Sequence, residues 1–436
     1  MILNANWFIR ASDCDPALWK EGFPPLIEGK WWYESLEQAQ LEDQFSFLYL
    51  ELRNHENIAI ALAPCFVMDM PLEMVAPDTM IPALRFLAKY YPPLLHQRTF
   101  FVGSPCSDQG WIGLKPGMNP SEIERVFRTL HQAVLQKANE LGAPMRVWKD
   151  MPEQFGVIFN AISPDFNLFR VVSFPGTEVI LPDVMVPSKT NSNQAKPKNV
   201  EDQIRERYLT LRKEAYFTSI KPSRRQKLRR TLRRAEAAID LRIELIQHPS
   251  SALLDSLFNL FWQTYEHATT RFEKLNQTFF EAMAKVDCCR FIVIYPAGES
   301  ALRHRLNDPS GNTPHSSFPS TEPVAFMLVY VNGAKLVNKF IGINYSAPKE
   351  WFLYFRLWDA CVDLAIEGGY HAIESGQTGY DAKISVGHQM IPLTNYCHHA
   401  NPVLRWVYAL VGRQVTWESL DPELARLGND LEDTSF

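Results

Sequence analysis

Residues 324–343, VAFMLVYVNGAKLVNKFIGI, contain two apolar runs that meet across Asn332-Gly333. An Asn-Gly pair between two such runs is typical of a tight β-hairpin, because both residues tolerate positive φ angles. The pattern then predicts a helix that begins at Pro348 and ends at Gly368-Gly369. Residues 370–375 form the next expected strand. Because a helix connects it to the hairpin, this strand should lie parallel to the second hairpin strand.

The expected strand runs into a polar loop, ESGQTGYDAK, at residues 374–383. Its glycines allow a sharp bend that presents side chains to a cleft. Transfer of a chemical group to a nucleophile needs a base for the proton of the nucleophile and a group that stabilises the negative charge that develops. Glu374 is therefore a candidate base, Tyr380 a candidate proton donor and Lys383 a candidate charge stabiliser. Gln377 is a candidate binding residue. The alternative is a structural loop in which Glu374 and Lys383 pair.

The bulk composition is that of a globular protein. The 436 residues are 46% hydrophobic and 21% charged, and the net charge of -5 predicts no general attraction to nucleic acid. The seven cysteines include no CxxC pair, which favours reduced thiols in a cytoplasmic protein. The first residues lack the features of a secretory signal, and no apolar run reaches the length of about 18 residues that a transmembrane helix needs.

Composition also predicts two domains. One stretch lacks aromatic residues and is rich in Ser, Asn, Lys and Pro, so it is expected to be a linker. The predicted division is an N-terminal domain at 1–183, a linker at 184–204, a C-terminal domain at 205–413 and a tail at 414–436.

A basic helix is expected at residues 219–238. Between Lys221 and Arg234 it carries eight cations and no acid. Stacked cations on a helix cost stability unless an anion offsets them, and the arginine fork suits phosphate. The candidate phosphate contacts are Arg224, Arg225, Arg229 and Arg230. The alternatives are a solvated face, or arginines that pair with acids of the N-terminal domain.

The junction before the expected helix, GINYSAPK at 342–349, is a candidate donor site, since exposed N–H groups at a helix start bind pyrophosphate. Its candidate binding residues are Lys339, Asn344, Tyr345 and Lys349. The junction holds only one glycine, so the alternative is an ordinary helix start. A second cluster, His388, Cys397, His398 and His399, has the residue types but not the spacing of a zinc site, and no metal is predicted.

Three stretches resemble the FemAB-like branch of the GNAT superfamily of acyltransferases, a family labelled peptidoglycan biosynthesis or recognition. They are SIKPSRRQKLRRTLRRAEAAIDLRIEL at 219–245, WFLYFRLWDACVDLAIEGGYHAIESG at 351–376 and QTGYDAKISVGHQMIPLTNYCHH at 377–399. The segment KYYPPLLHQRTFFVGSP at 89–105 is similar to a tyrosine-proline segment of the family. The positions that match the family pattern are Glu374, Gly376, Gln377, Gly379, Lys383, Gly387 and His398 or His399.

The resemblance implies an α/β fold of the α+β type, with two GNAT-like domains, mixed and mostly antiparallel sheets and flanking helices. It implies transfer of an acyl or aminoacyl group from acyl-CoA or aminoacyl-tRNA, as co-substrate, to a small-molecule or peptide amine, with tRNA as a partner in the second case. No permanently bound cofactor is implied. The sequence departs from the family at Arg356, where many members have an acid. The alternative function is a non-catalytic module that binds an anionic polymer, lipid or RNA through residues 221–234.

Overall fold

The computed structural model describes residues 3–25, 27–41, 43–71, 82, 85–86, 89–90, 96–184, 198–268, 274–297 and 319–431. Most of the expected linker and residues 298–318 lie outside the described residues. The first half of the chain contains β1 (Asn4–Phe8), η1 (Ala11–Asp13), α1 (Pro16–Gly22), α2 (Lys30–Gln38), β2 (Ser46–Arg53), β3 (Ala59–Pro71), β4 (His96–Val102), β5 (Gly113–Leu114), α4 (Pro120–Glu140), β6 (Met145–Pro152), η4 (Glu153–Phe155), α5 (Gly156–Phe166), β7 (Phe169–Val172) and β8 (Gly176–Ile180).

The second half contains α6 (Lys198–Ser219), α7 (Pro222–Ala238), β9 (Leu241–Ile246), α8 (Ser251–His267), α9 (Gln277–Met283), β10 (Cys289–Pro296), β11 (Ala325–Asn332), β12 (Lys335–Ile343), η5 (Lys349–Trp351), α11 (Leu353–Glu367), β13 (Ala372–Glu374), α12 (Tyr380–Ser385), β14 (Gln389–Ile391), β15 (Leu393–His399), α13 (Pro402–Gly412), α14 (Trp417–Leu420) and α15 (Pro422–Leu431). No helix among the described residues is long and apolar enough to cross a membrane.

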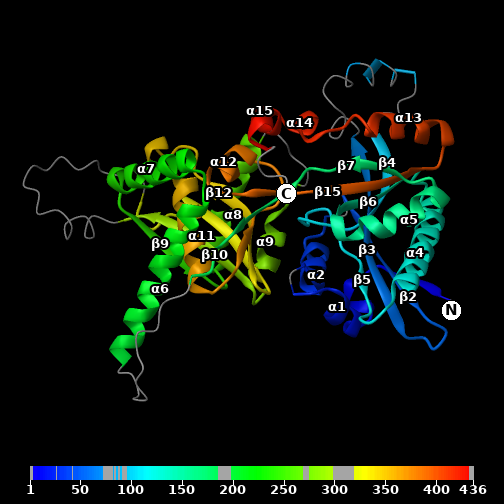
Figure 1. Ribbon diagram of the computed structural model, residues 1–436, viewed down its shortest axis with the longest axis horizontal. Coiled ribbons are helices and arrows are strands. Elements are labelled where there is room, and N and C mark those ends of the chain that lie inside the picture. The colour runs from blue at the N-terminus through cyan, green and yellow to red at the C-terminus, as the bar shows by residue number, and fades with distance from the viewer. Residues whose placement is uncertain are drawn as a thin grey trace, which may run out of the picture.

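The described strands form two sheets that lie side by side with helices around them (Figure 1). The first sheet has the order β1-β2-β3-β4-β6-β15-β7, with β5 beside β3, and the second has the order β14-β8-β13-β12-β11-β10-β9. Each sheet contains one parallel pair of described strands. In the first sheet this pair is β4 and β6, which α4 connects in sequence, and in the second it is β12 and β13, which α11 connects. The expected fold class, two mostly antiparallel mixed sheets with flanking helices, is confirmed.

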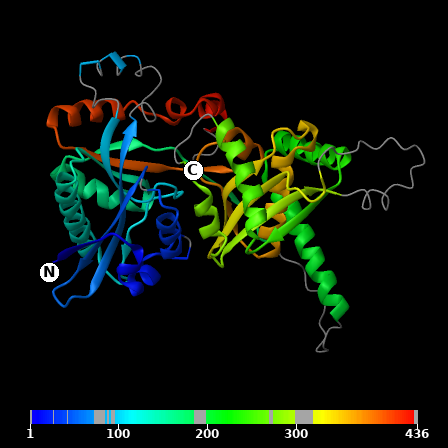
Figure 2. The same ribbon diagram turned by 180° about the vertical axis from the view of Figure 1, so that it is seen from behind.

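The two sheets exchange strands. β7 belongs to the first sheet and β8, four residues later, to the second, while β14 and β15 make the reverse passage. The two passages run side by side, since Gly176 pairs with Ile391 and the Ser173 amide donates to the carbonyl of Leu393. Figure 2 shows β15 crossing from the centre of the molecule into the first sheet. The domain boundaries at 183 and 205 stay a prediction, and β15 and α13 from beyond them pack on the first sheet.

The predicted hairpin is confirmed, with β11 and β12 antiparallel and β13 parallel to β12. The helix after it begins later than expected. Lys349–Trp351 form only a 3-10 turn, and Phe352 has a left-handed backbone with φ 46°. This residue interrupts the helical hydrogen bonds, so α11 starts at Leu353. Its end at Gly368 is as predicted, and Gly369 has the positive φ that follows a helix C-terminus.

Other elements of the second half follow their sequence patterns. The expected basic helix is present as α7, with Pro222 in its first turn, and β9, α8 and α9 follow it. The expected tail at 414–436 contains two short helices, α14 and α15. α15 packs on α12, where Arg426 pairs with Asp381 at 2.8 Å.

An apolar core joins the two halves. α2 from the first half packs on α9 from the second, with the Trp32 and Phe279 rings edge to face at 5.8 Å. Trp31 packs on Tyr330 of β11 in the same way at 5.1 Å. These rings are part of one buried cluster that continues through both halves. Aromatic burial of this kind stabilises a fixed contact between the halves rather than a loose one.

Candidate active site

Glu374 is buried at the end of β13, in the middle of the second sheet. The Nζ atom of Lys335, on the neighbouring strand β12, lies 3.5 Å from its carboxylate and 3.2 Å from that of Glu178 on β8. The register explains this arrangement, since Glu374 is opposite Val337 on one side and Glu178 on the other. The predicted base therefore points among charged groups rather than into bulk water.

A second lysine of β12 binds carboxylates from the other half of the chain. The Nζ atom of Lys339 lies 2.6 Å from Oδ1 of Asp108 and 3.8 Å from Oε1 of Glu28. The hydroxyl of Tyr330 donates to the same Glu28 oxygen at 2.7 Å. Lys339 also lies over the Trp32 ring, 5.0 Å from its centroid. These side chains are buried, so the two halves meet in a largely desolvated group of charges. The charged residues among them, together with the buried Glu374 and with Lys335, whose side chain is 25% exposed, form what we call the interdomain cluster: Glu28, Asp108, Lys335, Lys339 and Glu374.

The polar loop closes around Asp108. Gly376 has φ 60°, and a Cβ atom there would lie 2.6 Å from Oδ1 of Asp108. The other carboxylate oxygen, Oδ2, is buried and accepts no hydrogen bond from the described residues. A buried acceptor without a donor costs free energy that a ligand can recover. This makes Oδ2 of Asp108 the most informative atom of the site.

Lys383 holds the loop in shape. From α12 its Nζ atom donates to the carbonyl oxygens of Ser375, Gly376 and Gln377. Three acceptors use all three hydrogens of an ammonium group. Burial lowers the pKa of Lys383 to about 7. Lys383 therefore lies next to the predicted base, but its contacts are those of a residue that positions the loop.

His388 fixes the same loop from a second side. Its Nε2 lies 2.8 Å from Oγ of Ser375, and its Nδ1 lies 2.9 Å from the Lys383 carbonyl oxygen. Burial lowers the pKa of His388 to about 3, so the ring is neutral at pH 7. In the tautomer that fits both contacts, Nδ1–H donates to the carbonyl and Nε2 accepts from the serine hydroxyl. Asn338 donates to the same hydroxyl at 3.4 Å.

The electrostatics of the interdomain cluster favour a proton on Glu374. Burial first, and then the charge of Asp108, raise the pKa of Glu374 to about 8, although Lys335 acts in the opposite direction. Burial also raises the pKa of Glu28. Burial opposes the charged form of Lys339, but Asp108 and Glu28 outweigh it and the pKa of Lys339 is raised. A carboxyl group that titrates near neutral pH is suited to proton transfer.

Tyr380 and Gln377 do not join this cluster. The Tyr380 hydroxyl donates to the Pro175 carbonyl at 3.0 Å, and its ring is buried in a small apolar cluster with Phe174 and Leu424. Burial raises the pKa of Tyr380. The amide of Gln377 donates to the Phe174 carbonyl at 3.1 Å. Both side chains therefore donate hydrogen bonds to backbone carbonyl groups of the segment between β7 and β8.

The four residues predicted to bind the acyl donor do not lie together. Asn344, Tyr345 and Lys349 lie beyond the far end of β12, where Tyr345 is exposed and stacks on His267 at 3.9 Å. Lys339 alone lies in the interdomain cluster. The single glycine of the junction, Gly342, serves packing: a Cβ atom there would lie 2.6 Å from the backbone nitrogen of Phe261 in α8. The expected helix start at this junction is replaced by η5, as described above.

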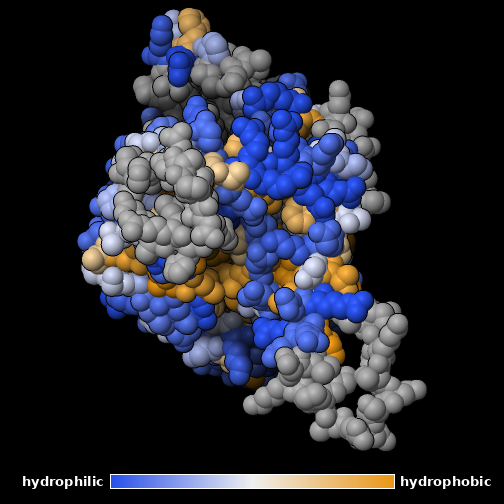
Figure 3. All heavy atoms as spheres, turned by 90° about the vertical axis from the view of Figure 1, so that its left-hand side faces the viewer, coloured by the Kyte–Doolittle hydropathy of each residue, from blue (hydrophilic) through white to orange (hydrophobic). Residues whose placement is uncertain are grey.

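The basic helix presents its cations in different ways. Arg229 pairs with Glu214 at 2.5 Å and lies over the Phe217 ring, and Arg225 donates to the Thr218 carbonyl at 3.2 Å. Arg224 is half-buried, and Arg230 is exposed. Figure 3, which looks at this end of the molecule, shows a largely hydrophilic upper part above a hydrophobic band. The acid that pairs with Arg229 lies in α6 of the second half, and not in the N-terminal domain from which the alternative expected such partners.

The histidines near the end of the matched pattern lie in the first sheet. His399 is 2.7 Å from Gln97, and His398 is 3.1 Å from Arg405. Burial lowers the pKa of His398 to about 4. The described residues contain no group of three His, Cys, Asp or Glu side chains placed to hold a metal ion.

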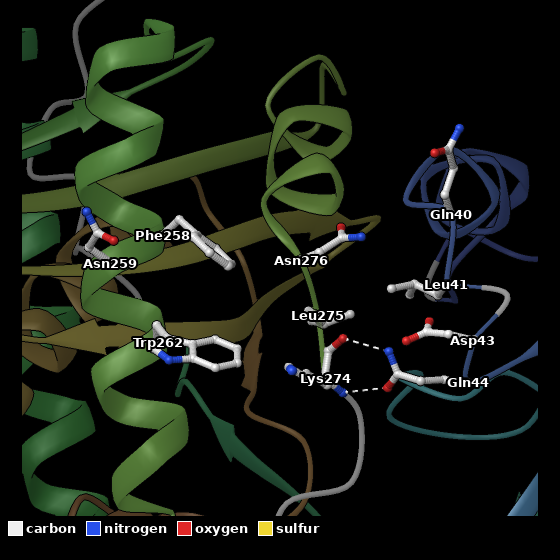
Figure 4. Close-up of a pocket in the computed structure, with 10 residues that line it drawn as sticks. All are labelled: Gln40, Leu41, Asp43, Gln44, Phe258, Asn259, Trp262, Lys274, Leu275 and Asn276. Atoms are coloured by element: carbon white, nitrogen blue, oxygen red, sulfur yellow. Dashed lines mark hydrogen bonds between the residues drawn. The ribbon is translucent and has the colours of Figure 1, made fainter.

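A cavity of about 570 Å³ lies beside the contact between the halves. Figure 4 shows Lys274 and Asn276 between α8 and the segment that follows α2. Gln44 binds the backbone of Lys274 through two hydrogen bonds of 3.0 Å, and Trp262 forms the α8 wall. None of the residues of the interdomain cluster lines this cavity.

Sequence analysis missed Asp108 and Glu28. Asp108 follows the segment 89–105, which already matched the family pattern, and lies in the loop after β4. The strand β4 corresponds in topology to β12, since each has a parallel partner across a helix. This correspondence between the two sheets marks the loop after β4 as a second candidate position for an acid of the site.

Comparisons with known proteins agree with this architecture. A family model described as the acetyltransferase (GNAT) domain matches residues 222–301. A search of curated proteins found no match. A crystal structure of FemX superposes with a TM-score of 0.56 and 8% sequence identity, over 94% of this chain and 100% of the FemX chain. The structure of L-PGS from Bacillus licheniformis has a TM-score of 0.45 and 13% identity, over 92% of this chain and 97% of that one.

The resemblance to the FemAB-like branch of the GNAT superfamily is thus confirmed at the level of fold. The chain has the fold of FemX over nearly its whole length, and its residues 222–301 are similar to the GNAT acetyltransferase domain.

Proposed function

We propose that the protein transfers an acyl or aminoacyl group to a primary amine at the interdomain cluster. The observation that carries this proposal is the buried Oδ2 atom of Asp108, which has no donor among the described residues, in a carboxylate whose other oxygen, Oδ1, faces the loop at Gly376. An ammonium or amine N–H of an acceptor supplies the donor that this atom lacks. FemX supports the proposal because it shares the fold.

In this proposal Glu374 is the base. It takes a proton from the acceptor nitrogen, directly or through one water molecule, and the nitrogen then attacks the carbonyl carbon of the donor. The bond from that carbon to the thioester sulfur, or to the ester oxygen of a charged tRNA, breaks, and the leaving group departs with its electron pair. A pKa of about 8 for Glu374 makes the rate rise with pH toward that value.

Lys383 and His388 are positioning residues in the same proposal, because their hydrogen bonds hold Ser375 and Gly376 against Asp108. Tyr380 is left out of the reacting groups, since its hydroxyl is bound to the Pro175 carbonyl. The donor phosphates are assigned to the exposed cations of α7, where Lys227 and Arg230 extend into solvent.

A second function, a non-catalytic module that binds an anionic polymer through α7, is favoured by one observation. All three hydrogens of Lys383 are used by carbonyl groups of its own loop, so the charge stabiliser that the sequence suggested has no hydrogen left for a substrate.

Thermal unfolding separates the two functions. Acetyl-CoA, longer acyl-CoAs and aminoacyl-tRNA are compared with uncharged tRNA and polyphosphate. A ligand that binds only the folded chain raises the melting temperature. The transferase proposal predicts a larger shift with one donor than with its deacylated form. Equal shifts with every polyanion, all lost as salt is added, contradict it and favour the binding module.

A further inference from the structure

Helix α13 carries an apolar stripe that faces solvent. Val403, Trp406, Val407 and Leu410 are spaced by three and four residues, so they share one side of the helix. Their exposed fractions are 67%, 67%, 37% and 47%. A helix that packs on a sheet normally turns polar side chains to water. Over about two turns, α13 instead presents a continuous hydrophobic surface.

The other side of α13 is already occupied. It packs on β7 of the first sheet, where Gly412 approaches so closely that a Cβ atom would lie 2.7 Å from Val171. Asn401 caps the first turn by accepting from the amides of Val403 and Leu404 at 2.9 and 3.2 Å. The helix is therefore fixed in place by its inner face, and the exposed stripe is not needed for the fold.

The segment of chain that carries the stripe is free of acids over a long stretch. No acid occurs from residue 382 to residue 417, although the chain has 49 acids and a net charge of -5. Within that stretch Arg413 is exposed near the end of α13. The stretch 79–107 is also free of acids, and its described residues include exposed Phe86, Lys89 and Tyr90. Figures 1 and 2 place α13 and the described residues between 82 and 90, drawn in blue, along the same upper edge of the molecule.

We propose that this edge docks on an anionic lipid surface, with the α13 stripe inserted at the boundary between headgroups and acyl chains. Trp and Tyr prefer that boundary because their rings are apolar and their N–H or O–H groups stay hydrated. Cations without neighbouring acids attract anionic headgroups. Binding of a protein partner would explain the apolar stripe alone, whereas a lipid surface accounts for the stripe and for the lack of acids within these two segments.

The full-length chain is tested by co-sedimentation with vesicles. Phosphatidylcholine vesicles are compared with vesicles that contain one quarter phosphatidylglycerol, at low and at high salt. The proposal predicts that binding to the anionic vesicles is stronger by about tenfold or more, and that salt weakens it. Failure of the unmodified chain to bind anionic vesicles overturns the proposal, and this outcome does not depend on any variant.

The variant Val403→Asp/Val407→Asp tests the stripe itself. Both side chains point to solvent, so the fold is retained, which circular dichroism verifies. Vesicle binding should fall by about tenfold or more, because charges replace the inserted apolar groups. Ile9→Asp, at an exposed apolar residue outside the proposed edge, should bind as the unmodified chain does. Equal binding by the double variant refutes insertion of α13. A chain that dimerises in solution, and whose double variant is monomeric, refutes it too and assigns the stripe to a second copy.

Discussion

The Nζ atom of Lys339 lies 2.6 Å from Oδ1 of Asp108, although 231 residues separate the two along the chain. The pair joins the loop after β4 to the middle of β12, and so connects the two sheets. It is buried together with Glu28, whose carboxylate is 3.8 Å from the same nitrogen. A buried ion pair of this kind fixes the relative position of its two side chains but adds little net stability, because the cost of desolvating both charges offsets much of their attraction.

Removing one partner of the pair should therefore be costly. Lys339→Met keeps the contact with Trp32 but leaves the carboxylates of Asp108 and Glu28 without their cation. The free energy of unfolding, measured with urea, should fall by about 3–5 kcal/mol. The double variant Lys339→Met/Asp108→Asn should recover part of this loss, because fewer buried charges remain unpaired.

Arg128→Met is the matched control. Arg128 also contacts two acids, Glu124 at 2.8 Å and Asp165 at 2.5 Å, but on the surface. Its loss should cost no more than about 1 kcal/mol. Equal losses for Lys339→Met and Arg128→Met would show that the interdomain cluster is not desolvated.

The two glycines of the polar loop provide a second test of the contact between the halves. Gly376 and Gly379 have nearly the same backbone, with φ 60° and 64°, but only Gly376 faces Asp108. An alanine at Gly379 meets no atom within 4 Å, so Gly379→Ala should cost only the strain of a left-handed residue, about 1 kcal/mol.

Gly376→Ala adds a clash with the Asp108 carboxylate to the same backbone strain, and should cost about 2–3 kcal/mol. Urea unfolding of the two variants gives the difference directly. If the two variants lose the same free energy of unfolding within about 0.5 kcal/mol, the Asp108 carboxylate is not in close contact with the loop at Gly376.

The raised pKa of Glu374 predicts how stability depends on pH. Its ordinary value is 4.5 and its value in the folded chain about 8, so the folded chain holds this proton through a window in which the unfolded chain has lost it. The contribution to stability is fully present below about pH 4.5 and is lost as the pH rises to about 8.

Glu374→Gln removes this titration. Its free energy of unfolding should fall less steeply with pH across the same window than that of the unmodified chain, and it should be the more stable protein at pH 8. The check is a series of urea titrations from pH 5 to pH 8. Parallel slopes for the two proteins would mean that Glu374 titrates normally.

The exposed cations of α7 should set the salt dependence of tRNA binding. If Lys227 and Arg230 each contact a phosphate, Lys227→Ala/Arg230→Ala should reduce the slope of log K against log salt by about 1.5. Filter binding of total tRNA measures the slope. Lys20→Ala/Lys115→Ala, which removes two exposed lysines of the first half, is the control and should leave the slope unchanged. If both double variants have the same slope, α7 does not contact the phosphates of tRNA.

Sequence patterns were sufficient for elements whose partners are close in the chain. The hairpin of β11 and β12 follows from Asn332-Gly333, and α7 from a run of helix-forming residues after Pro222. The start of α11 was wrong because nothing in the residues around Phe352 indicates that this residue adopts a left-handed backbone.

The site was only half predictable for a related reason. Glu374 and the bend at Gly376 belong to one local segment, so they could be named in advance. Asp108 and Glu28 reach them only through the contact between α2, the loop after β4 and the second sheet. The passage of β8 and β15 between the sheets is a pairing at long range as well, and strand patterns alone do not specify partners at such a distance.

The most direct test of the proposed activity is label transfer with the Asp108→Asn variant. Carbon-14 acetyl-CoA and tRNA charged with labelled amino acids are offered as donors, with lysine, a lysine-containing peptide and glucosamine as amine acceptors. We expect the unmodified chain to move label from one donor to an amine. Asp108→Asn should lower kcat by about 100-fold, with donor affinity and the fold unchanged, because the amide nitrogen cannot accept the hydrogen bond. Full turnover by this variant would contradict the assignment of the interdomain cluster as the active site.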